Sequence, residues 1–239
     1  MTAAALRAER VSRSVAAGGS RFTLLIQRFE VAPGARVAVV GPSGCGKSTL
    51  FALLALALRP DAGEVLMLDG TDALALWRAG RGDALAALRG QSLGFVPQTG
   101  ALLPFLSLRD NIALPQRILG RPDPARVSAL AERLGIAAIL ERRPAAVSVG
   151  QRQRAAVARA LAHRPAVVLA DEPTASVHPA QADAILDLLT RTAAEDGAAL
   201  VIATHDAARA EAAGYAIAPG RPNADVGADV ALTRFCWPA

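Results

Sequence analysis

The sequence predicts an α/β fold with a mostly parallel sheet, an N-terminal antiparallel β part and an inserted α-helical subdomain. Three observations lead to this prediction. A glycine-rich turn at 41–49 follows the apolar run 37–40 and precedes a helix, as phosphate-binding loops do. Apolar strands at 166–170 and 199–203 alternate with helices, which is typical of parallel sheets. Between 98 and 148 the pattern is helical, with breaks at proline and glycine.

The other elements are expected in chain order. Short strands fill residues 5–40, and the turn 32–34 separates the last two of them. The segment Pro60–Gly63 is expected to stop the helix that follows the glycine-rich turn. The later elements are strand 64–68, helix and loop 71–92, strand 93–97, helix breaks at Pro104, Gly120–Pro122 and Pro144, helix 148–162, strand 166–170, helix 179–194 and strand 199–203.

These elements predict a single domain with three parts. The core covers about 1–97 and 163–220, and the helical insert covers about 98–162. The tail 221–239 is rich in Pro, Gly and Asp and contains no motif that we can assign. A chain of 239 residues with 52% apolar residues is long enough for one α/β domain with a buried core.

Charge and composition limit the classes of partner and the cellular setting that we expect for this chain. The formal charge of +5 comes from scattered arginines, and only 4% of residues are aromatic, so we expect no nucleic-acid partner. Cys45 and Cys236 give no disulfide framework, which indicates a reducing, cytoplasmic setting. No signal peptide is expected, because Arg7 and Arg10 interrupt the apolar start. The apolar run that ends at Arg59 is too short to cross a bilayer, so any membrane contact would come through a partner.

The glycine-rich turn predicts a nucleoside triphosphate site of the P-loop NTPase type. It consists of Gly41, Pro42, Ser43, Gly44, Cys45, Gly46, Lys47, Ser48 and Thr49. Its glycines let backbone N–H groups converge on phosphate oxygens, and the following helix adds its dipole. Lys47, the only lysine of the chain, is expected to contact the β- and γ-phosphates, and the Ser48 hydroxyl to bind Mg²⁺.

Two acids follow the apolar strand 166–170, at the end of the sheet where α/β proteins build their sites. Asp171 is expected to hold Mg²⁺ and to contribute to nucleotide binding, and Glu172 to polarise the attacking water.

With these motifs and those below, the chain resembles the ATP-binding cassette (ABC) ATPases over about residues 6–220. Residues 41–49 resemble the Walker A loop of that family, and 167–171 resemble Walker B. Glu172 then occupies the position of the catalytic base. Residues 95–98 are similar to the Q-loop and 148–154 to the signature motif.

The resemblance implies roles for further residues. Gln98 would contact Mg²⁺ and sense the γ-phosphate, and His205 would be the switch histidine, so both join Glu172 as catalytic residues. Ser148, Gly150 and Gln151 would bind the γ-phosphate held on the opposite subunit.

The family implies an ATP hydrolase that uses ATP and Mg²⁺ and forms a homodimer. A separate membrane permease subunit would dock near Gln98 and the helical insert, which places the chain on the inner face of the cell membrane. Within the family, residues 103–115 look most like the lipoprotein-releasing and macrolide-export type.

Three positions depart from the family pattern. Val149 replaces the first signature glycine, His178 replaces the D-loop aspartate, and Val15 lies where an adenine-stacking aromatic is expected, with Phe22 as the nearest substitute. These departures leave open a weakly active regulatory cassette paired with an active one. A soluble, non-transport ABC ATPase is another alternative, although only one cassette fits the chain and no long coiled coil is present. A P-loop kinase is disfavoured, because the helix that Ser148 opens would have no role.

Overall fold

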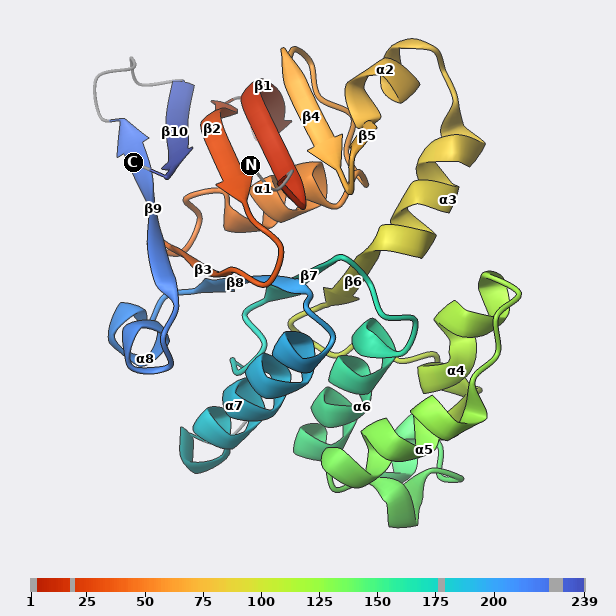
Figure 1. Ribbon diagram of the computed structural model, residues 1–239. Helices are drawn as coiled ribbons and strands as arrows, with labels where there is room; N and C mark the ends of the chain where they lie inside the picture. The colour runs from red at the N-terminus through yellow and green to blue at the C-terminus, as the bar shows by residue number, and fades with distance from the viewer. Residues whose placement is uncertain (1–3, 18–19, 176–178, 224–229, 239) are drawn as a thin grey trace.

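The computed structural model describes residues 4–17, 20–175, 179–223 and 230–238, and its ten strands form one twisted sheet (Figure 1). The strands are β1 (Leu6–Ala17), β2 (Ser20–Val31), β3 (Arg36–Val40), β4 (Val65–Leu68), β5 (Thr71–Asp72), β6 (Leu93–Val96), β7 (Val167–Asp171), β8 (Ala199–Thr204), β9 (Ala216–Asn223) and β10 (Val230–Trp237). Their order across the sheet is β5-β4-β1-β2-β10-β9-β3-β8-β7-β6.

The helices lie mostly between and below these strands in Figure 1. They are α1 (Lys47–Leu54), α2 (Ala73–Arg78), α3 (Gly82–Ser92), α4 (Leu108–Ile118), α5 (Pro124–Arg133), α6 (Val149–Leu161), α7 (Pro179–Glu195) and α8 (Ala207–Ala212). Two single 3₁₀ turns, Ala137–Ile139 and Pro144–Ala146, connect α5 to α6. None of the helices in the described ranges is long and apolar enough to span a membrane.

The sheet has a parallel part and an antiparallel part, as the sequence predicts. Strands β9, β3, β8, β7 and β6 pair in parallel, whereas β1 pairs antiparallel with β2 and β4. The register places Val40 beside Thr204 and Asp171 beside Ala203. The carboxyl ends of β3, β7 and β8 therefore meet at one edge of the sheet, where the predicted site lies.

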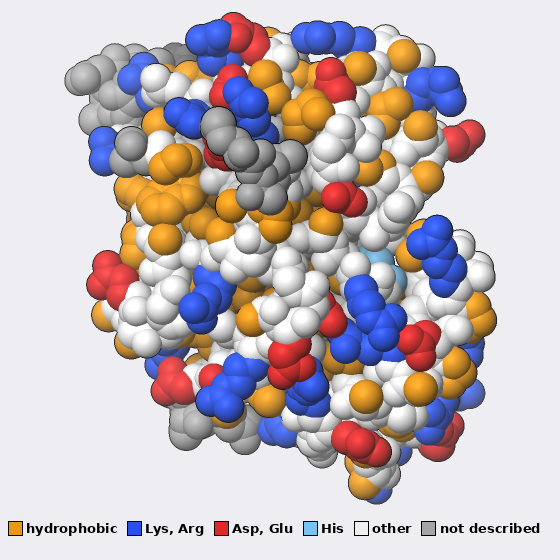
Figure 2. All heavy atoms as spheres, in the orientation of Figure 1, with side chains coloured by type: hydrophobic (Ala, Val, Ile, Leu, Met, Phe, Trp, Pro, Cys, Tyr) orange, Lys and Arg blue, Asp and Glu red, His pale blue; other side chains and the backbone are white. Residues whose placement is uncertain are grey.

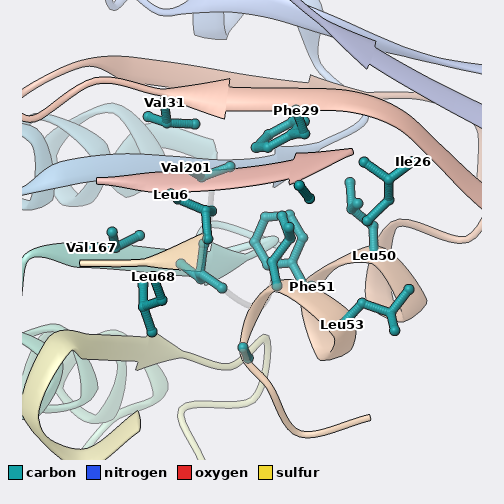
Figure 3. Close-up of a cluster of buried hydrophobic side chains, with 14 of the residues drawn as sticks. Leu6, Ile26, Phe29, Val31, Leu50, Phe51, Leu53, Leu68, Val167 and Val201 are labelled. Atoms are coloured by element: carbon teal, nitrogen blue, oxygen red, sulfur yellow. The ribbon is translucent and has the colours of Figure 1, made fainter. Parts of the chain in front are cut away.

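Helix α1 is held rigidly under the phosphate loop because its apolar side chains are fully buried. Leu50, Phe51 and Leu53 have no exposed surface and pack between the antiparallel strands and the parallel strands (Figure 3). Burying side chains of this size stabilises the fold by about 1.5–3 kcal/mol each. The start of the helix, and Lys47 with it, is fixed by this packing.

Helices α4, α5 and α6 form the predicted helical insert, drawn in green in Figure 1. Helix α6 packs closely on the edge strand β6, since a Cβ atom on Gly94 would lie 2.2 Å from the carbonyl oxygen of Ala160. The buried Gln116 of α4 donates to the carbonyl of Ala162 (2.8 Å) and accepts from the backbone of Asp123 (3.0 Å). These contacts attach α4 and the start of α5 to the end of α6.

Two details of the sequence interpretation are wrong. Helix α1 ends at Leu54, well before Pro60, because Leu56 adopts a left-handed conformation (φ 55°) and the N–H of Ala57 bonds to the carbonyl of Ala52 (2.9 Å). Such a C-terminal cap usually contains glycine, which is absent here. Strands β1 and β2 are also long, with 12 residues each, rather than short.

Residues 221–223 and 230–237 are part of the sheet, although the sequence gives no motif for them. Strand β10 pairs in parallel with β2 and antiparallel with β9, so it joins the two parts of the sheet. Its Phe235 is 1% exposed and packs against Gly220.

On the face shown in Figure 2, Lys and Arg side chains are interspersed with Asp and Glu side chains rather than gathered in one basic patch. The positive formal charge is spread over this surface, as the scattered arginines of the sequence indicate.

Candidate functional site

The phosphate loop connects the end of β3 to the start of α1, and its backbone requires glycine. Gly44 and Gly46 have φ angles of 80° and 92°, in the left-handed region that side chains disfavour. Gly46 is also the N-cap of α1, and a Cβ atom there would lie 2.5 Å from the ring of Phe22. The unpaired N–H groups at the start of α1 can therefore approach an anion.

Lys47 is the first residue of α1, and its side chain is 6% exposed. Its ammonium group donates to the carbonyl oxygens of Gly41 (2.7 Å) and Pro42 (3.1 Å), and lies 3.8 Å from Oε1 of Glu172. The charge is thus held inside the loop, and phosphate oxygens entering the loop would meet it directly.

Asp171, the last residue of β7, lies against the start of α1. Its carboxylate is hydrogen-bonded to the hydroxyl of Ser48. Burial raises the pKa of Asp171, while the hydrogen bond from Ser48 and the charge of Lys47 oppose this shift. One carboxylate and one hydroxyl are oxygen donors of the kind that suit Mg²⁺, which takes its other ligands from phosphate and water. In the parts of the chain that the structure describes, no group of three or more His, Cys, Asp or Glu could hold a metal alone.

Glu172 follows in an unusual backbone conformation. Its φ of 45° is rare for a residue with a side chain, and its N–H bonds to the carbonyl of Ala203 in β8 (3.0 Å). The carboxylate lies between Lys47 and Nδ1 of His205, which is 3.9 Å from Oε2. His205 itself is 68% exposed at its side chain. The strained turn aims the Glu172 carboxylate at the phosphate loop.

The phosphate loop, Gln98 and Glu172 line one cavity of about 390 Å³, whereas Asp171 and His205 are not among its lining residues. Its wall is formed by Phe22, Ser43, Gly44, Gly46, Lys47, Ser48, Thr49, Gln98 and Glu172. Of the predicted catalytic residues, Gln98 and Glu172 therefore line the cavity. His205 lies outside it, with its Nδ1 atom 3.9 Å from Oε2 of Glu172.

The predicted signature residues are not among those that line this cavity. Ser148 caps α6, because its hydroxyl accepts from the N–H of Gln151 (3.3 Å) and its own N–H donates to the Gln151 side chain (2.9 Å). Val149 is the first helical residue and is 44% exposed, whereas Gly150 is buried. Valine has no unusual φ at this position, so the missing glycine does not strain the helix start.

Two arginines that the sequence interpretation missed connect the site to its surroundings. Arg159 of α6 donates to the carbonyls of Gly100 (3.0 Å) and Ala101 (2.8 Å), just after Gln98. Arg209 of α8 bonds to Asp183 of α7 (2.8 Å) and lies 3.2 Å from Asp206, next to His205. No local pattern could have revealed the contacts of Arg159 with Gly100 and Ala101 or of Arg209 with Asp183, which join residues distant in sequence, whereas Arg209 and Asp206 are only three residues apart. His178 lies outside the described residues.

Comparisons with known proteins agree with this geometry. The sequence profile described as "ABC transporter" matches residues 26–175. The chain is 42% identical over 215 residues to the lipoprotein-releasing system ATP-binding protein LolD of Idiomarina loihiensis, a match covering 88% of this chain and 92% of that protein. It is 44% identical over 218 residues to LolD of Bordetella pertussis, again covering 88% and 92%.

Solved structures are similar as well. A dimeric post-hydrolysis structure of the ATP-binding cassette MJ0796 bound to ADP and Pi has a TM-score of 0.76 and 28% identity, covering 90% of this chain and 93% of that one. Another dimeric structure of MJ0796, described as a bacterial ABC transporter cassette, has a TM-score of 0.77 and the same identity and coverage.

Proposed function

This chain belongs to the ABC transporter family, and from this premise we propose that it is the ATP-binding and ATP-hydrolysing subunit of a transporter, working as a homodimer. The observation that carries the proposal is the cavity in which the phosphate loop, the buried Lys47 and the strained Glu172 meet. Phosphate recognition and water activation are then available within one site.

The proposed roles follow from the contacts. Lys47 and the N–H groups of the loop neutralise the β- and γ-phosphates. Ser48, Asp171 and Gln98 would hold Mg²⁺, since they surround the phosphate loop with oxygen donors. The ion would supply positive charge at the phosphate oxygens. Glu172 accepts a proton from the attacking water, and His205, 3.9 Å away, orients the carboxylate and the water.

Each ATP would lie between two copies of the chain. Ser148, Gly150 and Gln151 do not line the cavity of their own chain, yet the α6 start presents a capped helix terminus with an exposed Val149. A helix terminus of this kind binds anions. The MJ0796 structures, described as dimeric, support the same arrangement here.

A mixing experiment tests this shared site. Ser148→Asp keeps a good N-cap but places a negative charge against the γ-phosphate, so we expect this variant to be inactive. A Lys47→Ala chain is expected to be inactive for a different reason, because its own loop is broken. In a mixture, the mixed dimers contain one intact site made from both chains.

We expect the mixture to hydrolyse ATP at up to about a quarter of the wild-type rate, while each variant alone is inactive. Ser148→Asn, a neutral N-cap, is the matched control and should keep most of the activity. A mixture that stays as inactive as its components would contradict the shared site.

This chain has a surface that suits docking of the proposed membrane partner. An apolar groove of about 560 Å³ lies between the edge strand β6 and helix α4, beside the segment that follows Gln98. Phe95 and Ile118 in this groove are 36% and 72% exposed, an unusual exposure for large apolar side chains. The molecule narrows on this side between α3 and the insert (Figure 2). We propose that a cytoplasmic helix of a permease subunit binds here, which places the chain on the inner face of the membrane.

Ile118→Asp should abolish this docking without changing ATP hydrolysis by the isolated chain. A charge placed at a central interface position costs about 2 kcal/mol or more, which is roughly 30-fold in affinity. The measurement is the amount of membrane subunit that co-purifies with the tagged chain from solubilised membranes. Ala129→Asp, on the exposed side of α5, adds the same charge to the insert outside the groove and serves as the control. Equal recovery with Ile118→Asp would exclude the groove as the docking site.

A further inference from the structure

We propose that Arg221 of β9 and Arg234 of β10 form a binding site for a phosphate group, separate from the cavity at the phosphate loop. The two residues are direct partners in the antiparallel pairing of these strands, which are drawn in blue in Figure 1. Directly opposite residues project from the same face of a sheet, so two positive charges lie side by side. Like charges in this arrangement destabilise a strand pair, and an anion bound between them removes the repulsion.

These arginines lie on the outer face of the sheet without a counter-charge. Phe235, the residue after Arg234, is buried in the core, whereas Arg221 and Arg234 are exposed. Among the residues that the structure describes, neither arginine forms an ion pair. The arginines of β1 and β2 with described side chains all pair with a carboxylate, namely Arg7 with Glu9, Arg10 with Glu64, Arg13 with Asp61 and Arg28 with Glu30. Uncompensated positive charge on the described side chains of these strands is therefore concentrated at Arg221 and Arg234.

A concave site of about 300 Å³ lies over the two arginines. Its described lining consists of Gln27, Pro219, Arg221, Pro222, Arg234 and Cys236. The register of β10 on β2 shifts between Phe235 and Cys236, and Gln27 consequently has no partner residue in β10. A β-bulge of this kind often redirects a side chain toward a site. These lining residues are all different from those that line the cavity at the phosphate loop.

Two guanidinium groups and one amide favour a phosphate over a carboxylate. Each guanidinium presents a fork of N–H donors that matches two phosphate oxygens. The two positive charges match a phosphate monoester, which carries a charge of about −1.5 to −2 at pH 7. A carboxylate carries a single charge and would leave one arginine unneutralised. A phosphate of this kind occurs free in solution and in the headgroup of phosphatidic acid.

Thermal unfolding in sodium phosphate tests the site, because a ligand that binds the folded chain raises its Tm. Every chain compared carries Lys47→Ala, which removes the phosphate-directed charge of the phosphate loop. Losing charge-assisted hydrogen bonds weakens phosphate binding about tenfold or more. In Arg221→Gln/Arg234→Gln we therefore expect to lose most of the rise in Tm that phosphate produces over sodium chloride of equal ionic strength.

The matched control is Arg7→Gln/Arg109→Gln, which removes two arginines that pair with carboxylates outside the site and should keep the rise in Tm. Phosphate also stabilises folded proteins nonspecifically, so the readout is the difference between the two double variants. The same comparison with Lys47 intact and the ATP cavity filled by Mg-ADP covers the case in which Lys47→Ala impairs folding. ATP hydrolysis by Arg221→Gln/Arg234→Gln with Lys47 intact should equal that of the wild type.

Stability without phosphate gives a second readout. Removing the two like charges should leave Arg221→Gln/Arg234→Gln at least as stable as its parent at low salt. A clear loss of stability there would assign the arginines a structural role and overturn the site.

Sedimentation with vesicles of phosphatidylcholine, alone or mixed equally with phosphatidic acid, distinguishes the two sources of the phosphate. Binding to the mixed vesicles that depends on Arg221 and Arg234 assigns a lipid headgroup, whereas a response to inorganic phosphate alone assigns a free phosphate. Equal stabilisation of both double variants by phosphate, together with vesicle binding that does not depend on the two arginines, would refute the proposal.

Discussion

Replacing Glu172 by glutamine is expected to slow ATP hydrolysis by about 10²–10⁴-fold while leaving ATP binding intact. The carboxylate lies 3.8 Å from the ammonium of Lys47 and 3.9 Å from His205, and it lines the phosphate cavity. Glutamine keeps the shape of the side chain and the strained turn but cannot accept a proton from water. The loss should therefore appear in kcat and not in the affinity for ATP.

Single-turnover hydrolysis and equilibrium binding of ATP measure the two quantities separately. Glu141→Gln makes the same chemical change on the exposed surface of the insert, where Glu141 pairs with Arg109, and is the matched control. If Glu172→Gln hydrolyses ATP within a few-fold of the wild type, another residue must activate the water.

Replacing Lys47 by alanine is expected to abolish detectable ATP binding. Hydrogen bonds to a charged group contribute about 1.5–3 kcal/mol each, so losing this group from a buried site lowers affinity by at least about 100-fold when it contacts two phosphates. No other lysine can substitute, since the chain has only one. Lys47 also holds the carbonyls of Gly41 and Pro42, so the loop itself loses two contacts.

The measurement is equilibrium binding of a fluorescent ATP analogue, with thermal unfolding followed in parallel to confirm that the variant is folded. Arg164→Ala removes one positive charge from an exposed position outside the cavity and controls for the change in net charge. Unchanged binding in Lys47→Ala would refute the assignment of the phosphate loop.

The strand, turn and helix that carry the predicted phosphate loop are predicted well from the sequence because their signals are local. A strand, a glycine-rich turn and a helix follow one another within twenty residues, and the turn needs glycine at Gly46 for steric reasons that recur wherever such loops occur. The ends of the parallel strands β3, β7 and β8 can also be predicted locally, since each is a short apolar run, followed by the glycine-rich turn after β3 and ending in polar residues in β7 and β8. Parallel pairing then brings these ends together.

Features without a local sequence signal, or that depend on distant contacts, could not be predicted in this way. The early end of α1 uses a left-handed Leu56 in place of glycine, so its cap carries no sequence signal. Strand β10 is defined by its pairing with β2, some two hundred residues earlier in the chain. The contact between Phe22 and Gly46 likewise depends on how the β1–β2 hairpin lies over the loop.

The proposal that two chains share their ATP molecules is tested most directly by the molar mass of the Glu172→Gln chain in the presence of Mg²⁺ and ATP. Because this variant binds ATP but hydrolyses it slowly, the closed state should accumulate. Light scattering after size exclusion is expected to give twice the 24.6 kDa of one chain with ATP, and a single-chain mass with ADP or without nucleotide. A single-chain mass at saturating ATP would contradict the shared site.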